Sequence, residues 1–279
     1  MENTAEYAPY PKDLVCLHKK TTGGVIYPYH RHDGYEIFLF LEGNVQLYLE
    51  ENCYELKPGD LTIMSPVNMH RIYTKDKEAY ERITINLRKE VIEQISTQHT
   101  DLFSCFSICD KSSIAPISLN TTDREKIVAL ADHLSATMEA NEYGADIQVR
   151  NALSEILLLV NKCFLAGAEQ KQSIMPELVR DTMLYIQDHI NEPLSLEQLS
   201  IVMYHNGAYL SRLFKKHTGL SLHAYILDRR IEHAKQQLRK GCSVSETCLT
   251  SGFSDYSNFI RNFTAKVGSS PGKWGRENR

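Results

Sequence analysis

Two similar stretches near the C-terminus constrain this chain more than any other feature of its sequence. The first spans Tyr209–Gly219, and the second, 49 positions later, spans Asn258–Gly268. Identical residue types stand at three matching positions: Arg212 and Arg261, Phe214 and Phe263, and Gly219 and Gly268. A short arginine-bearing helix that ends at glycine, present twice, indicates two copies of one small helical module. Such modules are too small to form an enzyme pocket alone, but two of them can enter successive major grooves of DNA.

Charge is distributed unevenly along the chain, whose formal net charge is −4. Residues 1–172 carry 17 Lys and Arg against 25 Asp and Glu, whereas residues 173–279 carry 14 against 10. A basic C-terminal part behind an acidic N-terminal part is typical of a tail that meets phosphates, although an ordinary solvated surface can show the same balance.

The sequence lacks the marks of export or of membrane insertion. Residues 1–11 are polar and rich in proline, with no apolar core of a signal peptide. The longest apolar run, around Ile156–Val160, is far shorter than the ~18 residues that span a bilayer. The seven cysteines are scattered, and Cys105 and Cys109 have no second ligand pair nearby, so we expect reduced thiols. These features predict a cytoplasmic protein with no membrane partner.

Residues 24–87 predict a small β-barrel or jelly roll, which we assign to residues 1–120. Turns are expected at Glu42–Asn44 and Pro58–Asp60. Short β-prone segments lie at 35–41, 45–49, 53–56, 61–64 and 82–86. Many short strands with regular turns are characteristic of such barrels.

From Thr122 the apolar period becomes helical. One helix is expected to run to Met138 behind a Thr122/Asp123 cap, and a second from Asp146 to Phe164. The pair should pack antiparallel because the connection is short. The wide apolar surface at Leu153–Phe164 fits either a dimer interface, which we assign to residues 121–167, or packing on the barrel.

A polar, aperiodic stretch predicts an interdomain linker at residues 168–176, with Pro176 at the start of the next helix. The remainder should be an all-helical domain over residues 177–279, with helix-turn-helix motifs at about 197–218 and 244–267. The predicted fold class is therefore α+β: a barrel, two helices, and then a helical domain.

Each module has a predicted buried stripe, and Ser195 is a candidate cap of a helix in which Leu196 and Leu199 face inward. Small residues next to an arginine let a helix approach DNA closely while the guanidinium reaches a base edge or a phosphate. The buried stripes are Leu210, Leu213 and Phe214 in the first module and Phe259 and Phe263 in the second. The predicted DNA-binding residues are Asn206, Ala208, Ser211, Arg212, Lys215, Ser254, Asp255, Tyr256, Asn258 and Arg261.

At these residues the chain resembles the AraC/XylS family of bacterial transcription regulators. The second motif of that family is a Gly-Phe turn followed by Ser, Phe, Arg, Phe, Gly, Ser/Thr-Pro and an aromatic residue. It appears here over Gly252–Phe263, Gly268–Pro271 and Trp274, and the resemblance covers about residues 174–276.

The resemblance implies that helices at about 207–217 and 255–266 read bases, held on one DNA face by a connecting helix at about Tyr225–Lys240. It also implies promoter DNA, RNA polymerase and a small-molecule effector as partners, with activation as the commoner role. The alternative for Arg212 and Arg261 is an ion pair with a neighbouring carboxylate.

Two departures from the family pattern bear on this interpretation. Thr264 and Ala265 replace basic residues, which should weaken the grip of the second module on phosphate. Thr247 and Cys248 replace an apolar residue and an alanine, which affects packing only.

A histidine cluster forms a second pattern. His30, His32 and Glu36, with Gly24 and Gly43, match the first motif of the cupin superfamily. The second motif is degraded: Asn68 replaces its glycine, and His70 follows Pro66 by four positions. His30, His32, Glu36 and His70 could hold Zn, Fe, Mn or Ni. Alternatively, they hydrogen-bond a small ligand or one another, which fits the use of this barrel in the AraC/XylS family as an effector-binding domain.

The predicted effector-binding residues share polar or aromatic side chains that suit a hydroxyl-rich ring, so a carbohydrate is the expected effector. They are Tyr27, His30, His32, Glu36, Phe38, Tyr48, His70 and Arg71. The segment Tyr7–Pro11 could close over the barrel mouth, behind a disordered tail at Met1–Ala5. Together these features predict a homodimeric DNA-binding regulator with no enzymatic activity. The alternative is a metal-dependent cupin enzyme with a helical appendage.

Overall fold

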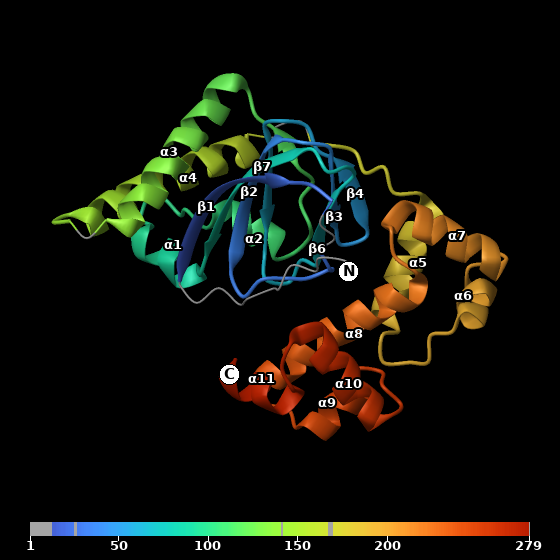
Figure 1. Ribbon diagram of the computed structural model, residues 1–279. Helices are drawn as coiled ribbons and strands as arrows, with labels where there is room; N and C mark the ends of the chain where they lie inside the picture. Colours follow the sequence, from blue (N-terminus) through green and yellow to red (C-terminus); the bar gives the residue numbers. More distant parts are fainter. Residues whose placement is uncertain (1–12, 25–26, 141, 167–169, 279) are drawn as a thin grey trace. The chain divides into compact units, whose positions relative to one another are not determined.

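The computed structural model describes residues 13–24, 27–140, 142–166 and 170–278 (Figure 1). The predicted segment Tyr7–Pro11, the tail before it and part of the predicted linker lie outside these residues. The chain divides into two compact units. The first comprises the chain up to Tyr27 and Arg31–Ile174, and the second comprises Pro28–His30 and Met175–Arg279.

The first unit contains two antiparallel sheets, a five-stranded one in the order β1-β7-β2-β5-β8 and a three-stranded one in the order β4-β3-β6. Its strands are β1 (Leu14–Thr22), β2 (Tyr35–Glu42), β3 (Val45–Leu49), β4 (Asn52–Glu55), β5 (Asp60–Met64), β6 (His70–Thr74), β7 (Ala79–Leu87) and β8 (Ile117–Ser118). Its helices are α1 (Lys89–Ile95), α2 (Ser104–Cys109), α3 (Thr121–Glu139) and α4 (Ala145–Leu165).

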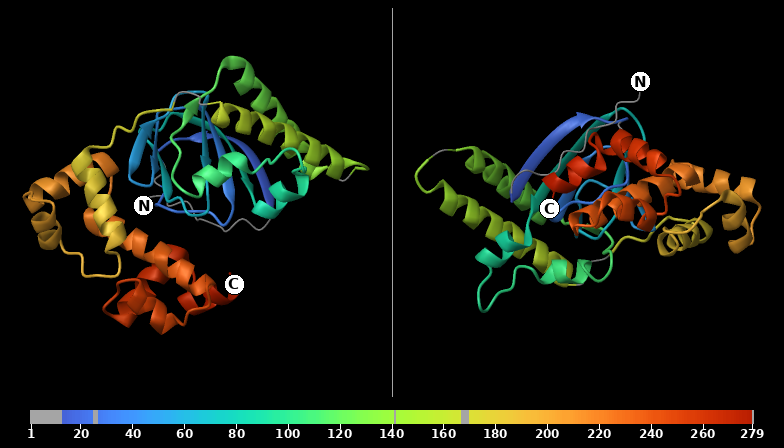
Figure 2. Two further views of the ribbon diagram at one scale, coloured as in Figure 1. Left: turned by 180° about the vertical axis from the view of Figure 1, so that it is seen from behind. Right: turned by 90° about the horizontal axis from the view of Figure 1, so that it is seen from below.

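The side chains of β2 show why the five-stranded sheet is buried on both faces. Tyr35, Ile37 and Leu39 join a core cluster that contains residues of α3 and α4, and Figures 1 and 2 show these helices against this sheet. Phe38 and Phe40 alternate with them and point the other way, into a second cluster with apolar residues of the three-stranded sheet. Strand alternation therefore assigns each side chain to one of two cores. We call the space between the two sheets the interior.

Strands β1 and β6 were not predicted from the sequence. Strand β1 lies at the edge of its sheet, and the exposed end of the strand, Lys19–Thr22, has no apolar alternation. Strand β6 contains His70 and Arg71 among only five residues, so its composition does not indicate a strand. Both are fixed by pairing with β7 and β3, which local sequence does not reveal.

The two predicted helices are present as α3 and α4. The N-cap of α3 is Asn120, not Thr122 or Asp123, and its Oδ1 accepts a hydrogen bond from the Asp123 backbone N–H at 2.9 Å. The predicted apolar surface of α4 packs mainly within the unit, because Leu153, Ile156, Leu157 and Val160 are buried in the core. None of the helices in the described ranges is both long and apolar enough to cross a membrane.

The second unit consists of helices, as predicted. They are α5 (Glu177–Asp188), α6 (Leu196–Val202), α7 (Gly207–Thr218), α8 (Leu222–Arg239), α9 (Val244–Thr250), α10 (Tyr256–Val267) and α11 (Pro271–Glu277). Helices α6 and α7 form the first module, α9 and α10 form the second, and α8 connects them. Gly219 and Gly268 end α7 and α10 with φ of +70° and +78°, a conformation that glycine adopts without strain.

Local capping accounts for the start of the first module. Ser195 and Gln198 form a capping box at α6, as the sequence predicts. Of the two leucines predicted to face inward, Leu199 is fully buried, as predicted, whereas the prediction for Leu196 was wrong because it is 43% exposed. Leu196 is the first residue of the helix, before the turn that faces the core.

Candidate functional site

Helix α7 presents one buried and one exposed face. Leu210 and Phe214 are fully buried, whereas Ala208, Arg212 and Lys215 are exposed or partly exposed. Leu213 and Ser211 are half-buried, so Leu213 contributes less to the core than predicted. Asn206 caps the helix, because its Oδ1 accepts hydrogen bonds from the backbone N–H groups of Ala208 (3.0 Å) and Tyr209 (3.2 Å).

The exposed arginine of α7 is Arg212. Among the described residues, no carboxylate pairs with the Arg212 guanidinium and no side chain hydrogen-bonds it. The alternative of an ion pair is therefore not realised at this position. The basic side chains of the last turn, Lys215 and Lys216, are exposed beside it.

Helix α10 repeats this plan with a different polar surface. Phe259 and Phe263 are fully buried, and Asp255 caps the helix by accepting from the Asn258 backbone N–H at 2.5 Å. Ser254 and Tyr256 are exposed at the start of the helix. The cap occupies the Asp255 carboxylate, which gives this residue a structural role that the sequence prediction did not assign.

A hydrogen-bond network links three polar side chains of α10. Arg261 donates to the Asn258 Oδ1 at 2.9 Å, and Asn262 donates to the same oxygen at 2.7 Å. Arg261 thus has an amide partner rather than the carboxylate of the alternative interpretation. At the other end of the helix, Lys266 pairs with Asp228 of α8 at 2.7 Å.

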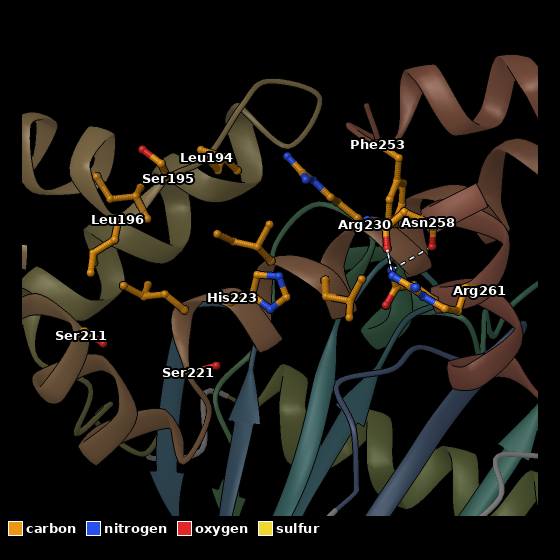
Figure 3. A pocket seen from close by; sticks show the side chains of 15 residues that line it. Leu194, Ser195, Leu196, Ser211, Ser221, His223, Arg230, Phe253, Asn258 and Arg261 are labelled. Atoms are coloured by element: carbon orange, nitrogen blue, oxygen red, sulfur yellow. Dashed lines mark hydrogen bonds between the residues drawn. The ribbon is translucent and has the colours of Figure 1, made fainter. Parts of the chain in front are cut away.

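A cleft of about 590 Å³ lies between the two modules. Ser211 of α7 lines it on one side, Asn258 and Arg261 of α10 line it on the other, and α8 contributes His223 and Arg230 (Figure 3). Side chains from both predicted recognition helices therefore share one cleft.

Three of the predicted histidine-cluster residues meet in the interior of the first unit. The His32 Nε2 lies beside a carboxylate oxygen of Glu36, and both side chains are buried. The His70 Nε2 lies 3.2 Å from the His32 Nε2 and 3.7 Å from the Glu36 Oε2, while its Nδ1 lies 3.1 Å from the Asn68 carbonyl oxygen. His70 is oriented by this backbone contact.

His30, the fourth predicted residue, belongs to the second unit, where its Nδ1 lies 2.9 Å from the Pro28 carbonyl oxygen. Within the first unit, the imidazoles of His32 and His70 beside the Glu36 carboxylate are donors that suit a divalent transition metal, and these residues fit such an ion.

The structure separates the other predicted effector residues into two groups. Phe38 is buried in the interior cluster and Tyr27 packs against it. Tyr48 and Arg71 pair across β3 and β6, one step from the Leu47–Ile72 pair, so they face away from the interior. The Arg71 guanidinium carbon lies 5.1 Å from the centre of the Tyr48 ring on that opposite face.

Two interior residues were missed by the sequence analysis. Thr62 pairs with Phe38 and Asn86 pairs with Glu36 across neighbouring strands, so both side chains face the interior. Within the described part of the chain, the Thr62 hydroxyl and both amide atoms of Asn86 are buried without a hydrogen-bond partner. A signal was available for Thr62, which alternates with the apolar Leu61 and Ile63, but it was weak for Asn86, because β7 also carries Glu81 and Arg82.

Comparison with known proteins agrees with the division of the chain into a β-rich first unit and a helical second unit. Residues 12–157 match the model of the AraC-like ligand binding domain, and residues 203–277 match that of a helix-turn-helix domain. The uncharacterized HTH-type transcriptional regulator YfiF of Bacillus subtilis is 26% identical over 87% of this chain and 77% of its own length. The Msm operon regulatory protein of Streptococcus mutans is 25% identical over 88% of this chain and 85% of its own.

Among solved structures, an apo variant of ToxT from Vibrio cholerae aligns over 98% of this chain and 100% of its own, with 10% identity and a TM-score of 0.43. The C-terminal domain of AraT of Geobacillus stearothermophilus aligns over 38% of this chain and 88% of its own, with 27% identity and a TM-score of 0.37. From the matched ligand-binding domain and the helix-turn-helix modules behind it, the chain belongs to the AraC family of DNA-binding transcriptional regulators.

Proposed function

We propose that this regulator is a cytoplasmic activator whose DNA binding is controlled by a neutral carbohydrate bound in the interior of the first unit. The observation that carries the DNA-binding role is the repetition of α7 and α10, each capped by a polar residue and each exposing an arginine. Effector binding then changes the affinity of the protein for DNA, and DNA binding changes its affinity for the effector by the same factor.

The interior supports a neutral, hydroxyl-rich effector. Asn86 offers a donor and an acceptor, Thr62 offers a hydroxyl, and all of these atoms lack partners in the described chain. An unmade hydrogen bond of a buried group costs roughly 1–3 kcal/mol, which a ligand hydroxyl offsets. The Glu36 carboxylate on the neighbouring strand disfavours an anionic ligand, and Phe38 supplies an apolar face.

DNA binding is tested with fragments of the protein's own upstream region, at two salt concentrations, with random DNA competing. Specific retention that falls steeply with salt is expected, because lysine and arginine contacts release counterions from the phosphates. No preference over random DNA by the folded protein, with or without effector, would contradict the regulator function. Reporter transcription from the same fragment then distinguishes activation, which requires productive contact with RNA polymerase, from repression.

The effector site is tested by thermal unfolding with D-galactose and with D-galacturonate, which adds a carboxylate. We expect galactose alone to raise the unfolding midpoint. Thr62→Val and Asn86→Leu should abolish this rise, yet stabilise the ligand-free protein because each removes an unsatisfied buried group. Thr22→Val, on the exposed end of β1, is the control and should change neither property. Stabilisation by galacturonate but not by galactose would contradict a neutral effector.

A homodimer is proposed through α4. Ile147, Leu158 and Leu165 are exposed, and their spacings of eleven and seven residues place them on one helical face. Leu158→Glu should shift the protein from dimer to monomer in sedimentation, whereas Glu155→Gln on the same helix should not. A wild-type protein that is monomeric at all concentrations would contradict this interface.

A divalent metal is the second candidate ligand of the interior, favoured by the approach of the His32 and His70 imidazoles to the Glu36 carboxylate. When bound, it would supply a Lewis-acidic anchor for an effector oxygen; we propose no catalytic activity. Metal analysis of the purified protein and of the His30→Ala/His32→Ala variant tests it. Full metal occupancy in the double variant would exclude these residues as ligands.

A further inference from the structure

Arg230 of α8 binds two backbone carbonyls in the segment that leads into the first module. Its Nε donates to the Ile190 oxygen at 3.2 Å, and one terminal nitrogen donates to the Glu192 oxygen at 2.7 Å. Both carbonyls lie in the segment between α5 and α6. The planar guanidinium can hold two acceptors at once, which fixes this segment against the middle of α8.

The same side chain reaches the second module. The guanidinium carbon of Arg230 lies 5.9 Å from the centre of the Phe253 ring. A Cβ atom at the neighbouring Gly252 would lie 2.3 Å from the Ile190 oxygen and 2.8 Å from the Arg230 Nε. Only glycine leaves room for this approach, and its φ of +76° also favours glycine. The turn of the second module therefore packs directly against the segment that leads into the first module.

Two neighbouring side chains of α8 make contacts on one side or the other. Arg229 donates to Gln187 of α5 at 2.6 Å. Asp228 pairs with Lys266 of α10, in the second module. Arg230 contacts both the segment before α6 and the turn of the second module.

Arg230 also lines the cleft between the recognition helices (Figure 3). Its Nε and one terminal nitrogen nevertheless donate to protein carbonyls. Burial lowers the pKa of the Arg230 guanidinium. A half-buried arginine that is bonded to two main-chain oxygens is poorly placed to leave them for a phosphate. Its role in this cleft is structural.

We propose that Arg230 is a positioning residue for DNA recognition: by joining the 190–192 segment to the Gly252–Phe253 turn, it fixes the orientation of α7 relative to α10. The protein then requires one spacing between the two base sequences that these helices read. Successive major grooves recur every 10–10.5 base pairs, so one inserted pair rotates the second site by roughly 35°. A rigid pair of modules cannot follow that rotation and loses the base contacts of one helix.

The experiment uses the full-length protein and a DNA fragment that it binds specifically, with the two contacted segments located by footprinting. One base pair is inserted or deleted between those segments. The wild-type protein should lose roughly 10- to 100-fold in affinity, the cost of a few base contacts. Arg230→Gln should bind the natural spacing more weakly, but its penalty for the altered spacing should shrink to about threefold or less.

Three variants separate positioning from other effects. Arg180→Gln removes an equal charge from an exposed site of α5 and should keep the full spacing penalty. Lys215 is an exposed cation of α7, and Lys215→Ala should weaken binding to the natural and the altered spacing by the same factor. Arg230→Lys keeps the charge but lacks the planar fork, so it should relax the spacing requirement as well.

The deciding quantity is the loss of DNA affinity when the spacing is altered by one base pair. Circular dichroism establishes that each variant is folded. A folded Arg230→Gln protein with the full wild-type penalty would overturn the proposal. If Arg230→Gln does not fold, Arg230→Lys decides in the same way, and an unchanged penalty overturns the proposal. The proposal rests on DNA binding alone, so failure of the proposed carbohydrate effector leaves it intact.

Discussion

Arg261 donates a hydrogen bond of 2.9 Å to the side-chain oxygen of Asn258, one turn earlier on α10. At the matching position of α7 stands Tyr209, and Arg212 has no such partner among the described residues. The guanidinium of the second module is therefore oriented before DNA arrives, while that of the first is free. Pre-orientation reduces the side-chain entropy that is lost on binding.

Arg261 and Asn258 are expected to act as a pair in DNA binding. Arg261→Ala should cost about 1–3 kcal/mol of specific binding free energy. Asn258→Ala should cost less, because it releases the arginine without removing it. A double-mutant cycle, measured on the specific DNA, should show a coupling of about 0.5–1 kcal/mol. Strictly additive losses would mean that Asn258 does not orient Arg261 on DNA.

Substitution of Arg212 and substitution of Lys215 should affect DNA binding in different ways. Arg212→Ala is expected to cost about 1–3 kcal/mol and to relax the preference at one base pair, because a guanidinium in the groove reads a base edge. Lys215→Ala should weaken specific and random DNA alike and lower the salt slope by about one. Titrations on both DNAs measure these effects. Equal loss on both for Arg212→Ala would assign Arg212 to the phosphates.

The capping residues of the two recognition helices, Asp255 and Asn206, can each be replaced by the other's residue type, which changes the charge near DNA and keeps a capping oxygen. Asp255→Ala should reduce stability by about 0.5–2 kcal/mol, since the Asn258 N–H loses its acceptor. Asp255→Asn keeps a capping oxygen and removes a negative charge near DNA, so it should raise affinity for any sequence. Asn206→Asp at the cap of α7 should do the opposite. Denaturant titrations and filter binding measure the two effects, and a change of the wrong sign in either variant would contradict this placement.

His18 should make the stability of the first unit depend on pH. Its Nδ1 lies 2.7 Å from an Asp132 carboxylate oxygen and its Nε2 lies 2.9 Å from one of Glu81, so both nitrogens donate only in the imidazolium form. Partial burial lowers the pKa of His18, but the hydrogen bonds to Asp132 and Glu81 and their charges raise it more, and the net pKa is raised.

Because the pKa of His18 is higher in the folded chain, its stabilisation is fully present below pH ~6.5. It is lost as the pH rises through the folded-state pKa. Unfolding midpoints between about pH 5.5 and 8.5 should therefore fall more steeply for the wild type than for His18→Gln. Parallel profiles for the two proteins would show that the His18 bridge does not contribute.

The helical part of the fold was predictable because its determinants are local. Ser195 and Gln198 cap α6 within four residues, and the apolar spacing of Phe259 and Phe263 lies within one helix. Even there, Leu196 was assigned to the wrong side, since the first turn of a helix has no preceding turn to define a face. The strands were less predictable, because β1 and β6 exist through pairing with distant segments.

The sequence by itself determined that this chain carries two copies of one arginine-bearing module behind a β-rich domain, because period, caps and repeat are encoded in neighbouring residues. Only the tertiary structure decided which side chains meet. Strand register turned Thr62 and Asn86 into the interior and Tyr48 and Arg71 out of it. The approach of Ile190 to Gly252, 62 residues apart, brought Arg230 between the modules. Such contacts depend on the packing of whole elements, which no local pattern records.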